Sequence, residues 1–224
     1  MDDTELQVLK ILIDTNRTLF DARRANQSRI NNFQNITEEG VEYLTDISVN
    51  FLDKALDSLR KDIQRTMVFM PEYSNFLENI REISIYDAGE LIVLIKDINR
   101  FKNKNSFIYY CGLSPVVKVG KKYQKITTNN KQYGTVIGSP KQDTSKIQYN
   151  DRLNKVILKI VRKLIQYNPQ YKRMYGDYLD NYAFKHPTYT MKHLKYMSQR
   201  KVATKFAKHL YSNFYKIENG DTYD

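Results

Sequence analysis

The sequence at residues 37–67 is TEEGVEYLTDISVNFLDKALDSLRKDIQRTM, and its pattern sets the structure expected for the first part of the chain. Apolar side chains recur every three or four residues along it, which is the spacing of one face of an α-helix. Thr37 comes directly before this series and can cap the helix by accepting a hydrogen bond from the first turn. Carboxylates fall early in the stretch and cations late, as the helix dipole favours. The stretch therefore predicts one long amphipathic helix, whose apolar positions are Val41, Leu44, Ile47, Phe51, Leu52, Ala55, Leu56, Leu59, Ile63 and Met67.

A second long helix is predicted before this one. Residues 5–34 contain no Pro or Gly and place Leu6, Leu9, Leu12, Ile13, Leu19 and Phe20 at helical spacing. Two helices of this length joined by a short link most simply form an antiparallel hairpin or half of a coiled-coil dimer. Because Pro71 ends the region, residues 1–70 are predicted to be a helical hairpin or coiled-coil linker.

The remaining residues, 71–224, are predicted to form a small helical domain. Apolar periodicity places its helices at about residues 87–97, 106–111, 151–167, 171–183 and 190–215, and Gly112 ends the second of these. Residues 116–150 are basic and rich in Gly, Thr, Asn and Gln, which is typical of an irregular loop with short strands at 116–117 and 135–137. The predicted fold is mainly α: a long helical hairpin, then a small helical domain with a basic irregular insertion.

The charge is divided unevenly between the two parts. The chain of 224 residues carries a formal net charge of +11. Residues 1–98 hold 11 Lys and Arg against 18 Asp and Glu, whereas residues 99–224 hold 25 against 7. Such a cationic half is expected to meet a polyanion, because cations that neutralise phosphates release counterions. The alternative is a basic protein from a lysine-rich, AT-rich genome, with the lysines as solvated surface charges.

The sequence lacks the residues that several classes of function require. Cys111 is the single cysteine and lies in an apolar stretch, so a buried small hydrophobic residue is the simplest interpretation. The histidines His186 and His193 lack a nearby carboxylate, and no phosphate-binding or dinucleotide-binding glycine motif is present. We therefore predict no catalytic residues, no metal and no cofactor. No apolar run reaches membrane-spanning length and no signal peptide opens the chain, so we expect a cytoplasmic protein.

One stretch carries a resemblance to a known family. Residues 91–115 read LIVLIKDINRFKNKNSFIYYCGLSP. They resemble the C-terminal domain of the bridge-RNA, DEDD-type insertion-sequence transposases and the related pilin-inversion recombinases. The shared pattern is an apolar helix, then Asp97-Ile98-x-Arg100-Phe101, then Tyr110-x-Gly112-Leu113-x-Pro115. Residues 16–29 are more weakly similar to the linker helix of that family, and Arg200-Lys201-x-Ala203 to its final helix.

The departures from the family pattern bear on catalysis. Family members begin with a ribonuclease-H-like domain that carries an acidic tetrad, and this chain starts at the linker helix. Their Gly-Ile-Gly hairpin corresponds here to Glu82-Ile83-Ser84, which lacks both glycines. Their strand-cleaving serine falls where this chain has Val119 and Gly120. The resemblance thus implies a fold and nucleic-acid contact that persist in a truncated or accessory form, without strand cleavage by the chain alone.

The predicted nucleic-acid-binding residues flank the Gly112 turn. Cations cluster there and tyrosines alternate with them, so phosphates and bases could both find partners. The set comprises Arg100, Lys102, Lys104, Lys118, Lys121, Lys122, Tyr123, Lys125 and Lys131. We expect DNA as the partner, which would associate the protein with the nucleoid, and a guide-type RNA is the alternative ligand. We also expect a homo-oligomer formed through the N-terminal helices.

Two other functions are compatible with the sequence. The chain could be a non-catalytic interaction protein whose hairpin dimerises and whose cations serve solubility. It could also be one half of a split recombinase that takes its acidic domain from a separate polypeptide. Salt-dependent binding to nucleic acid separates the DNA-binding function from the first alternative. Cleavage in the presence of an added acidic domain and magnesium tests the second.

Overall fold

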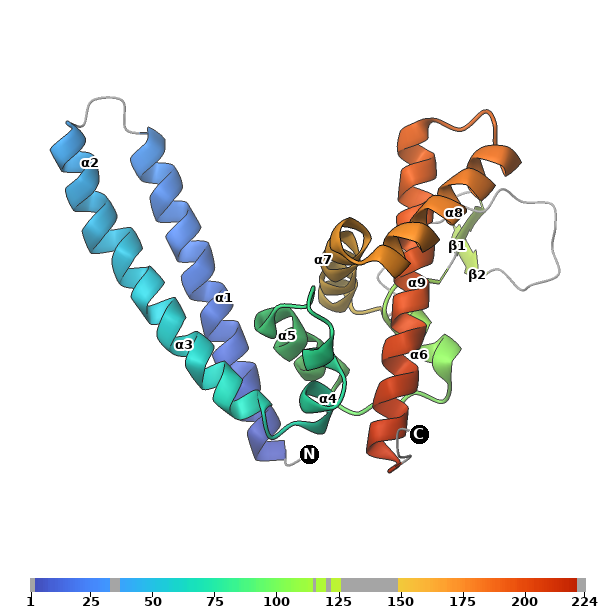
Figure 1. Ribbon diagram of the computed structural model, residues 1–224, viewed down its shortest axis with the longest axis horizontal. Helices are drawn as coiled ribbons and strands as arrows, with labels where there is room; N and C mark the ends of the chain where they lie inside the picture. Colours follow the sequence, from blue (N-terminus) through green and yellow to red (C-terminus); the bar gives the residue numbers. More distant parts are fainter. Residues whose placement is uncertain (1–2, 33–36, 115, 120–121, 126–148, 221–224) are drawn as a thin grey trace. The chain divides into compact units, whose positions relative to one another are not determined.

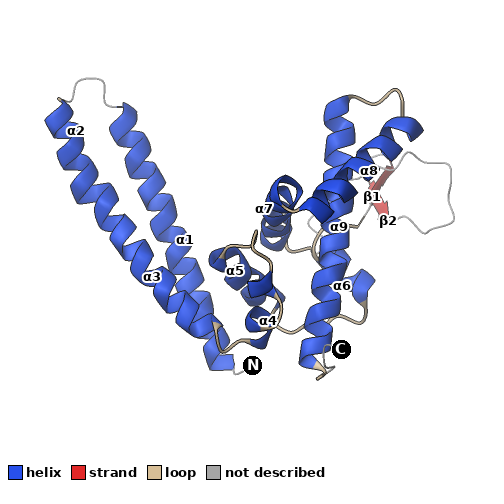
Figure 2. Ribbon diagram, viewed as in Figure 1, coloured by secondary structure: helices blue, strands red, loops and turns tan. Residues whose placement is uncertain are grey.

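The chain folds into two compact units, which a computed structural model describes over residues 3–32, 37–114, 116–119, 122–125 and 149–220. The first unit is Met1–Asn79 with Ser84–Val93, and the second is Ile80–Ile83 with Leu94–Asp224. Helices account for most of the described residues (Figures 1 and 2), which confirms the mainly α fold. In the described part of the chain, no helix combines the length and apolarity that a membrane span requires.

Two long helical arms form the first unit. Helix α1 is Asp3–Asn32, and the second arm runs through α2 (Glu38–Thr45), the π-helix η1 (Asp46–Asn50) and α3 (Phe51–Met67). The arms lie side by side and antiparallel (Figure 1). Thr37 caps the second arm as predicted, because its Oγ1 accepts a hydrogen bond from Gly40 N at 3.2 Å. The π-helical turn is a difference from the sequence prediction of a regular helix.

The hairpin arms are held together by apolar packing and one ion pair. Leu9 and Ile13 of α1 are buried, as are Ile63 and Met67 of α3. Farther along the arms, the guanidinium of Arg23 forms a bidentate pair with Asp53, with Nε–Oδ1 at 2.5 Å and Nη2–Oδ2 at 3.1 Å. Both side chains remain partly exposed, so the apolar contacts supply most of the stabilisation.

The first unit extends beyond the hairpin. It includes the short helices α4 (Pro71–Ser74) and η2 (Leu77–Asn79) and most of α5 (Ile85–Ile95). Gly89 of α5 lies so close to the hairpin that a Cβ there would stand 2.7 Å from Ile13 Cδ1 and 3.2 Å from Met67 Sδ. Residues 71–79 and 84–93 therefore belong to the same compact unit as the hairpin, and the domain boundary expected after residue 70 stays a prediction.

The second unit is built around its last helix. It contains α6 (Lys104–Tyr110), α7 (Asp151–Tyr167), α8 (Pro169–Lys185) and α9 (Met191–Glu218), and the first three pack against α9. Asn150, Asn168 and Thr190 cap α7, α8 and α9 through their side-chain oxygens. The buried side chains of α9, among them Val202, Phe206 and Leu210, run along most of its length.

Helices α7 and α5 show how the predicted helix bounds compare with the observed ones. Helix α7 spans the predicted residues, Asp151–Tyr167. Helix α5 ends at Ile95, two residues before the predicted end at Asp97, because Lys96 has a φ of 62° and lies outside the helical region.

A two-stranded antiparallel sheet follows α6. Strand β1 is Val116–Val119 and β2 is Lys122–Lys125, with Val116 opposite Lys125 and Lys118 opposite Tyr123. The strand predicted at 116–117 lies within β1, and the one predicted at 135–137 falls outside the described residues.

Candidate nucleic-acid interface

The loop between α5 and α6 presents the first three predicted cations. The guanidinium carbon of Arg100 lies 4.6 Å from the ring centre of Phe101 and 4.7 Å from that of Tyr110. Its Nη2 donates to the carbonyl oxygen of Leu94 at 3.3 Å. Lys102 and Lys104 are exposed beside it. The rings therefore fix the position of Arg100, while the two lysines are open to an anionic ligand.

The same loop is tied to the end of α9. The carboxylate of Glu218 accepts hydrogen bonds from Ile98 N at 3.1 Å and from Asn99 Nδ2 at 3.0 Å. Asn219 Nδ2 also donates to Asn99 Oδ1 at 3.1 Å. These bonds hold the loop in place, and they also put one acidic side chain next to the predicted basic patch. A phosphate at this loop would therefore meet a mixed local charge.

The turn after α6 is the most constrained part of the unit. Gly112 has a φ of +67°, a conformation that side chains with a Cβ rarely adopt. A Cβ at this position would stand 2.6 Å from Cδ2 of Tyr149, which is closer than carbon atoms pack. Cys111, next to it, is fully buried, and burial raises the pKa of its thiol well above the ordinary value. This burial confirms Cys111 as an inert apolar residue.

The carbonyl groups of this turn are held by side chains from two distant helices. Asn154 Nδ2 donates to the Cys111 carbonyl at 2.7 Å, and Arg200 Nη2 donates to the Gly112 carbonyl at 2.5 Å. Asn150 adds two bonds to Tyr110, from its backbone N to the carbonyl at 2.8 Å and from Nδ2 to the phenol oxygen at 2.9 Å. Residues 110–112, 150–154 and 200, which are far apart in the sequence, therefore form one hydrogen-bonded cluster, the Gly112 cluster.

Arg200 was not identified from the sequence as a structural residue. Its side chain is 1% exposed, and its guanidinium lies 5.8 Å from the ring centre of Tyr196. A buried guanidinium is costly unless it is hydrogen-bonded, so its bond to the turn accounts for its place inside the unit. A signal was present in the sequence: Arg200 follows Met197 by three residues and precedes Ala203 by three, on the buried face of α9.

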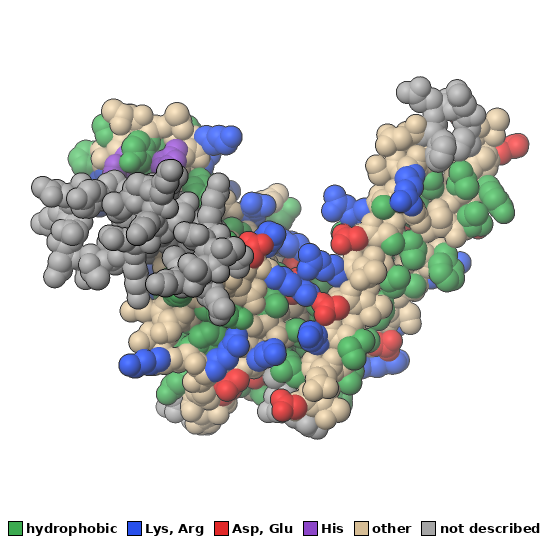
Figure 3. All heavy atoms as spheres, turned by 180° about the vertical axis from the view of Figure 1, so that it is seen from behind, with side chains coloured by type: hydrophobic (Ala, Val, Ile, Leu, Met, Phe, Trp, Pro, Cys, Tyr) green, Lys and Arg blue, Asp and Glu red, His purple; other side chains and the backbone are tan. Residues whose placement is uncertain are grey.

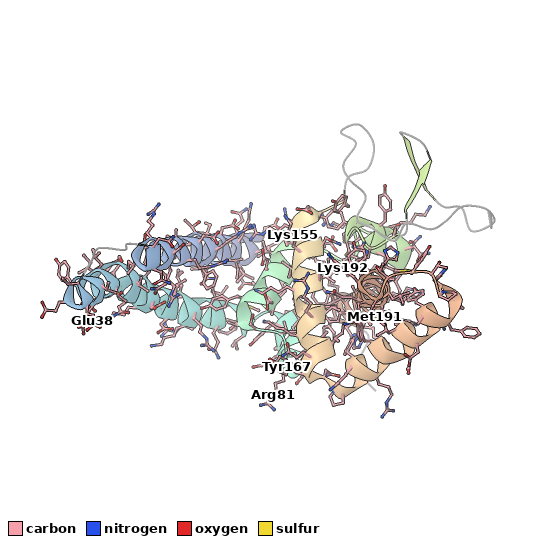
Figure 4. All side chains as sticks on the ribbon, turned by 90° about the horizontal axis from the view of Figure 1, so that it is seen from above. Glu38, Arg81, Lys155, Tyr167, Met191 and Lys192 are labelled. Atoms are coloured by element: carbon pink, nitrogen blue, oxygen red, sulfur yellow. The ribbon has the colours of Figure 1, made fainter. Side chains whose placement is uncertain are left out.

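Exposed cations form two short stripes on the second unit. On α7, Lys155, Lys159 and Arg162 are exposed at spacing i, i+4, i+7, and Lys155 pairs with Asp151 at 2.6 Å. Figure 4 shows Lys155 near the start of α7 and Tyr167 at its end. On α9, the exposed cations at the same spacing are Lys201, Lys205 and Lys208. No carboxylate among the described residues lies within ion-pair distance of these three lysines.

The structure describes only some of the residues that were predicted to form the basic patch. Lys118, Lys122, Tyr123 and Lys125 lie in β1 and β2, where Lys118 is opposite Tyr123, and Lys121 and Lys131 lie outside the described residues. Their joint action on a ligand stays a prediction. Lys201, Lys205 and Lys208 of α9 were not among the residues predicted for the site from the sequence.

Comparison with known protein families confirms the resemblance that the sequence carries. Residues 74–134 match the family model described as Transposase IS116/IS110/IS902 family. This match covers the stretch with the apolar helix, the Arg100 loop and the Gly112 turn, and it confirms the resemblance to the C-terminal transposase domain. No curated protein matches the chain. The protein is therefore transposase-related.

Proposed function

We propose that this transposase-related protein binds duplex DNA through the exposed cations of its second unit and does not cut DNA strands by itself. On this proposal it associates with the nucleoid, and a guide-type RNA is a competing ligand. The phosphate backbone supplies the attraction, since each lysine that neutralises a phosphate releases a condensed counterion.

The observation that carries this proposal is the absence of acidic residues from the sequence around the α9 stripe. Residues 181–217 contain eight Lys and Arg and no Asp or Glu. Three of these cations, Lys201, Lys205 and Lys208, are exposed on one face of α9. At spacing i, i+4, i+7 they cover about 10 Å of helix, which matches the separation of a few successive phosphates. A run of this kind supports phosphate contact more strongly than dispersed lysines do.

Charge removal tests the proposal. A variant with Lys201→Gln, Lys205→Gln and Lys208→Gln should bind a fluorescent DNA duplex at least about tenfold more weakly than the wild type at low salt. The matched control removes three exposed lysines of the first unit, through Lys10→Gln, Lys54→Gln and Lys61→Gln. Equal losses in the two variants would mean that only net charge matters, and no loss in the first would remove α9 from the interface.

The proposed lack of cleavage rests on the residues after the Gly112 turn. Val119 stands where the resembled family has its nucleophilic serine, and it offers no hydroxyl. Supercoiled DNA with magnesium should therefore remain uncut by the protein alone. If nicking begins when a family acidic domain is added, the protein is one half of a split recombinase instead. Nicking without that addition would overturn the proposal.

An exposed apolar stripe on the hairpin supports a separate proposal, that the protein forms a homo-oligomer through its N-terminal helices. Tyr43, Ile47 and Phe51 follow one another at spacing i, i+4, i+8, with 65%, 51% and 66% of their surfaces exposed. Large apolar side chains in a row along a helix are usually covered by a partner. We propose that a second copy of the hairpin covers them. If DNA binding fails its test, this stripe favours the function of an interaction protein.

A further inference from the structure

The corner where α8 meets α9 carries a column of aromatic rings that the proposed duplex contact does not use. The rings of Tyr182, His186, Tyr189 and His193 follow one another with centre-to-centre distances of 6.3, 4.7 and 4.8 Å. His186 and Tyr189 are parallel within 9°, and His193 meets Tyr189 edge-on. Figure 3 shows histidine side chains beside hydrophobic ones at this end of the second unit.

Backbone hydrogen bonds hold this column in place. His186 N donates to the Tyr182 carbonyl at 2.9 Å, and Tyr189 N donates to the His186 carbonyl at 3.0 Å. Thr190 caps α9 by accepting from His193 N at 3.3 Å. These bonds fix the backbone that carries the rings, which reduces the freedom that binding would have to restrict.

Part of this aromatic surface is open. Tyr189 is 38% exposed and Tyr196, in the second turn of α9, is 40% exposed. Tyr196 has the guanidinium of Arg200 near its ring at 5.8 Å, on the buried side of the helix. Met191, at the start of α9, is also exposed.

Exposed cations border the rings. Lys192 and Tyr196 are one turn apart on α9, and Lys195 lies between them in sequence (Figure 4 labels Met191 and Lys192). Lys185 is exposed at the end of α8. The nearest acidic residues before Lys185 in the sequence are Asp180 and Asp177. In α8, Asp180 lies more than one helical turn before Lys185, and Asp177 lies more than two turns before it. The corner thus combines π-faces with an excess of positive charge.

We propose that this corner, made of His186, Tyr189, Lys192, His193, Lys195 and Tyr196, binds unpaired nucleotides. Open aromatic rings take the faces of bases, and the lysines neutralise the backbone between them. In a duplex the base faces are covered by their neighbours, so this surface selects a single-stranded segment or a strand end. The proposal rests on the proposed function as a nucleic-acid-binding protein and names a second contact, distinct from the α9 stripe at Lys201–Lys208.

Binding of a labelled single-stranded oligonucleotide and of a duplex of the same length tests the proposal. Tyr189→Leu with Tyr196→Leu keeps apolar bulk but removes both rings, and it should weaken single-strand binding at least about fivefold while duplex binding changes less than about twofold. Tyr189→Phe with Tyr196→Phe should retain binding, since stacking needs the ring and not the hydroxyl. Tyr167→Leu, at an exposed tyrosine at the end of α7, is the matched control.

The outcomes separate this inference from the proposed function. If the wild type binds the duplex in a salt-dependent manner and the two leucine substitutions leave single-strand binding unchanged, the corner is not a nucleotide site and the proposed function stands. If the wild type binds duplex but not single strands, the inference is also overturned. If the wild type binds neither, both fail. Circular dichroism melting of each variant confirms that an observed loss is not a loss of folding.

Discussion

The Gly112 turn provides the sharpest test of the structure, through the substitution Gly112→Ala. The φ of +67° alone should cost about 1–2 kcal/mol for a residue with a Cβ. The new Cβ would also stand 2.6 Å from Cδ2 of Tyr149, and moving that ring out of a packed site should cost about 1–3 kcal/mol more. We expect Gly112→Ala to lower the free energy of unfolding by about 3 kcal/mol.

Two other glycines serve as controls for the two parts of this cost. Gly220 has a φ of +72°, but a Cβ there would meet no neighbouring atom within 4 Å, so Gly220→Ala should show backbone strain alone. Gly176 lies in α8 with open space around it, and Gly176→Ala should stabilise the protein by about 0.5–1 kcal/mol. Urea unfolding followed by circular dichroism ranks the three variants.

A double-mutant cycle isolates the steric part. When Tyr149→Ala is combined with Gly112→Ala, the ring that the new Cβ would strike is gone. The double variant should therefore be about 1–2 kcal/mol more stable than the sum of the single changes implies. Additive effects, or a Gly112→Ala variant within about 0.5 kcal/mol of the wild type, would refute the described packing of Gly112 against Tyr149.

Three further substitutions test other parts of the structure. Arg200→Met should lower the free energy of unfolding by about 2–4 kcal/mol, because it leaves the Gly112 carbonyl without its buried donor; urea unfolding measures the loss. Burial, with the nearby Glu82, raises the pKa of Tyr171 from 10.0 to about 12. The folded state therefore favours the neutral phenol, so stability is intact below pH 10.0 and falls as the pH rises toward 12; unfolding curves of Tyr171→Phe should lack this part of the fall. Phe51→Ser should shift the protein toward the monomer in sedimentation equilibrium, because it interrupts the exposed apolar stripe.

Each of these expectations has a contrary result. If the Arg200→Met variant is as stable as the Lys201→Met variant, whose substitution is at an exposed site, then the guanidinium of Arg200 contributes nothing to the stability of the Gly112 cluster. If Tyr171→Phe and the wild type lose the same stability between pH 10 and pH 12, the ionisation of Tyr171 is not the cause of that loss. A wild type that is monomeric at all concentrations would exclude the hairpin as a self-association surface.

The sequence predicted the elements whose signals are local. The strong apolar face of residues 151–167 predicted α7 with its observed bounds, and Thr37 predicted the cap of the second arm. Both signals lie within the segment that they shape: a periodic apolar face in one case, and a side chain next to the backbone group that it satisfies in the other. The early end of α5 depends on the backbone conformation of Lys96, which its residue type does not indicate.

The candidate site was less predictable because its contacts are long-range. The Gly112 cluster joins a turn to Asn154 and Arg200, which follow it by 42 and 88 residues along the chain. Arg200 belongs to a basic helix, so its charge suggested solvent exposure until its place on the buried face of α9 was known. The column at His186 likewise depends on how the chain turns between α8 and α9.

The salt dependence of duplex DNA binding shows whether the second unit recognises phosphates. Binding constants of the wild-type protein for one duplex, measured from low to moderate salt, should fall linearly on logarithmic axes with a slope of about −3 or steeper, which corresponds to at least about three or four neutralised phosphates. The variant that lacks Lys201, Lys205 and Lys208 should show a slope that is shallower by about two or more. Binding that does not weaken with salt, or a slope that these substitutions leave unchanged, would contradict phosphate recognition by the second unit.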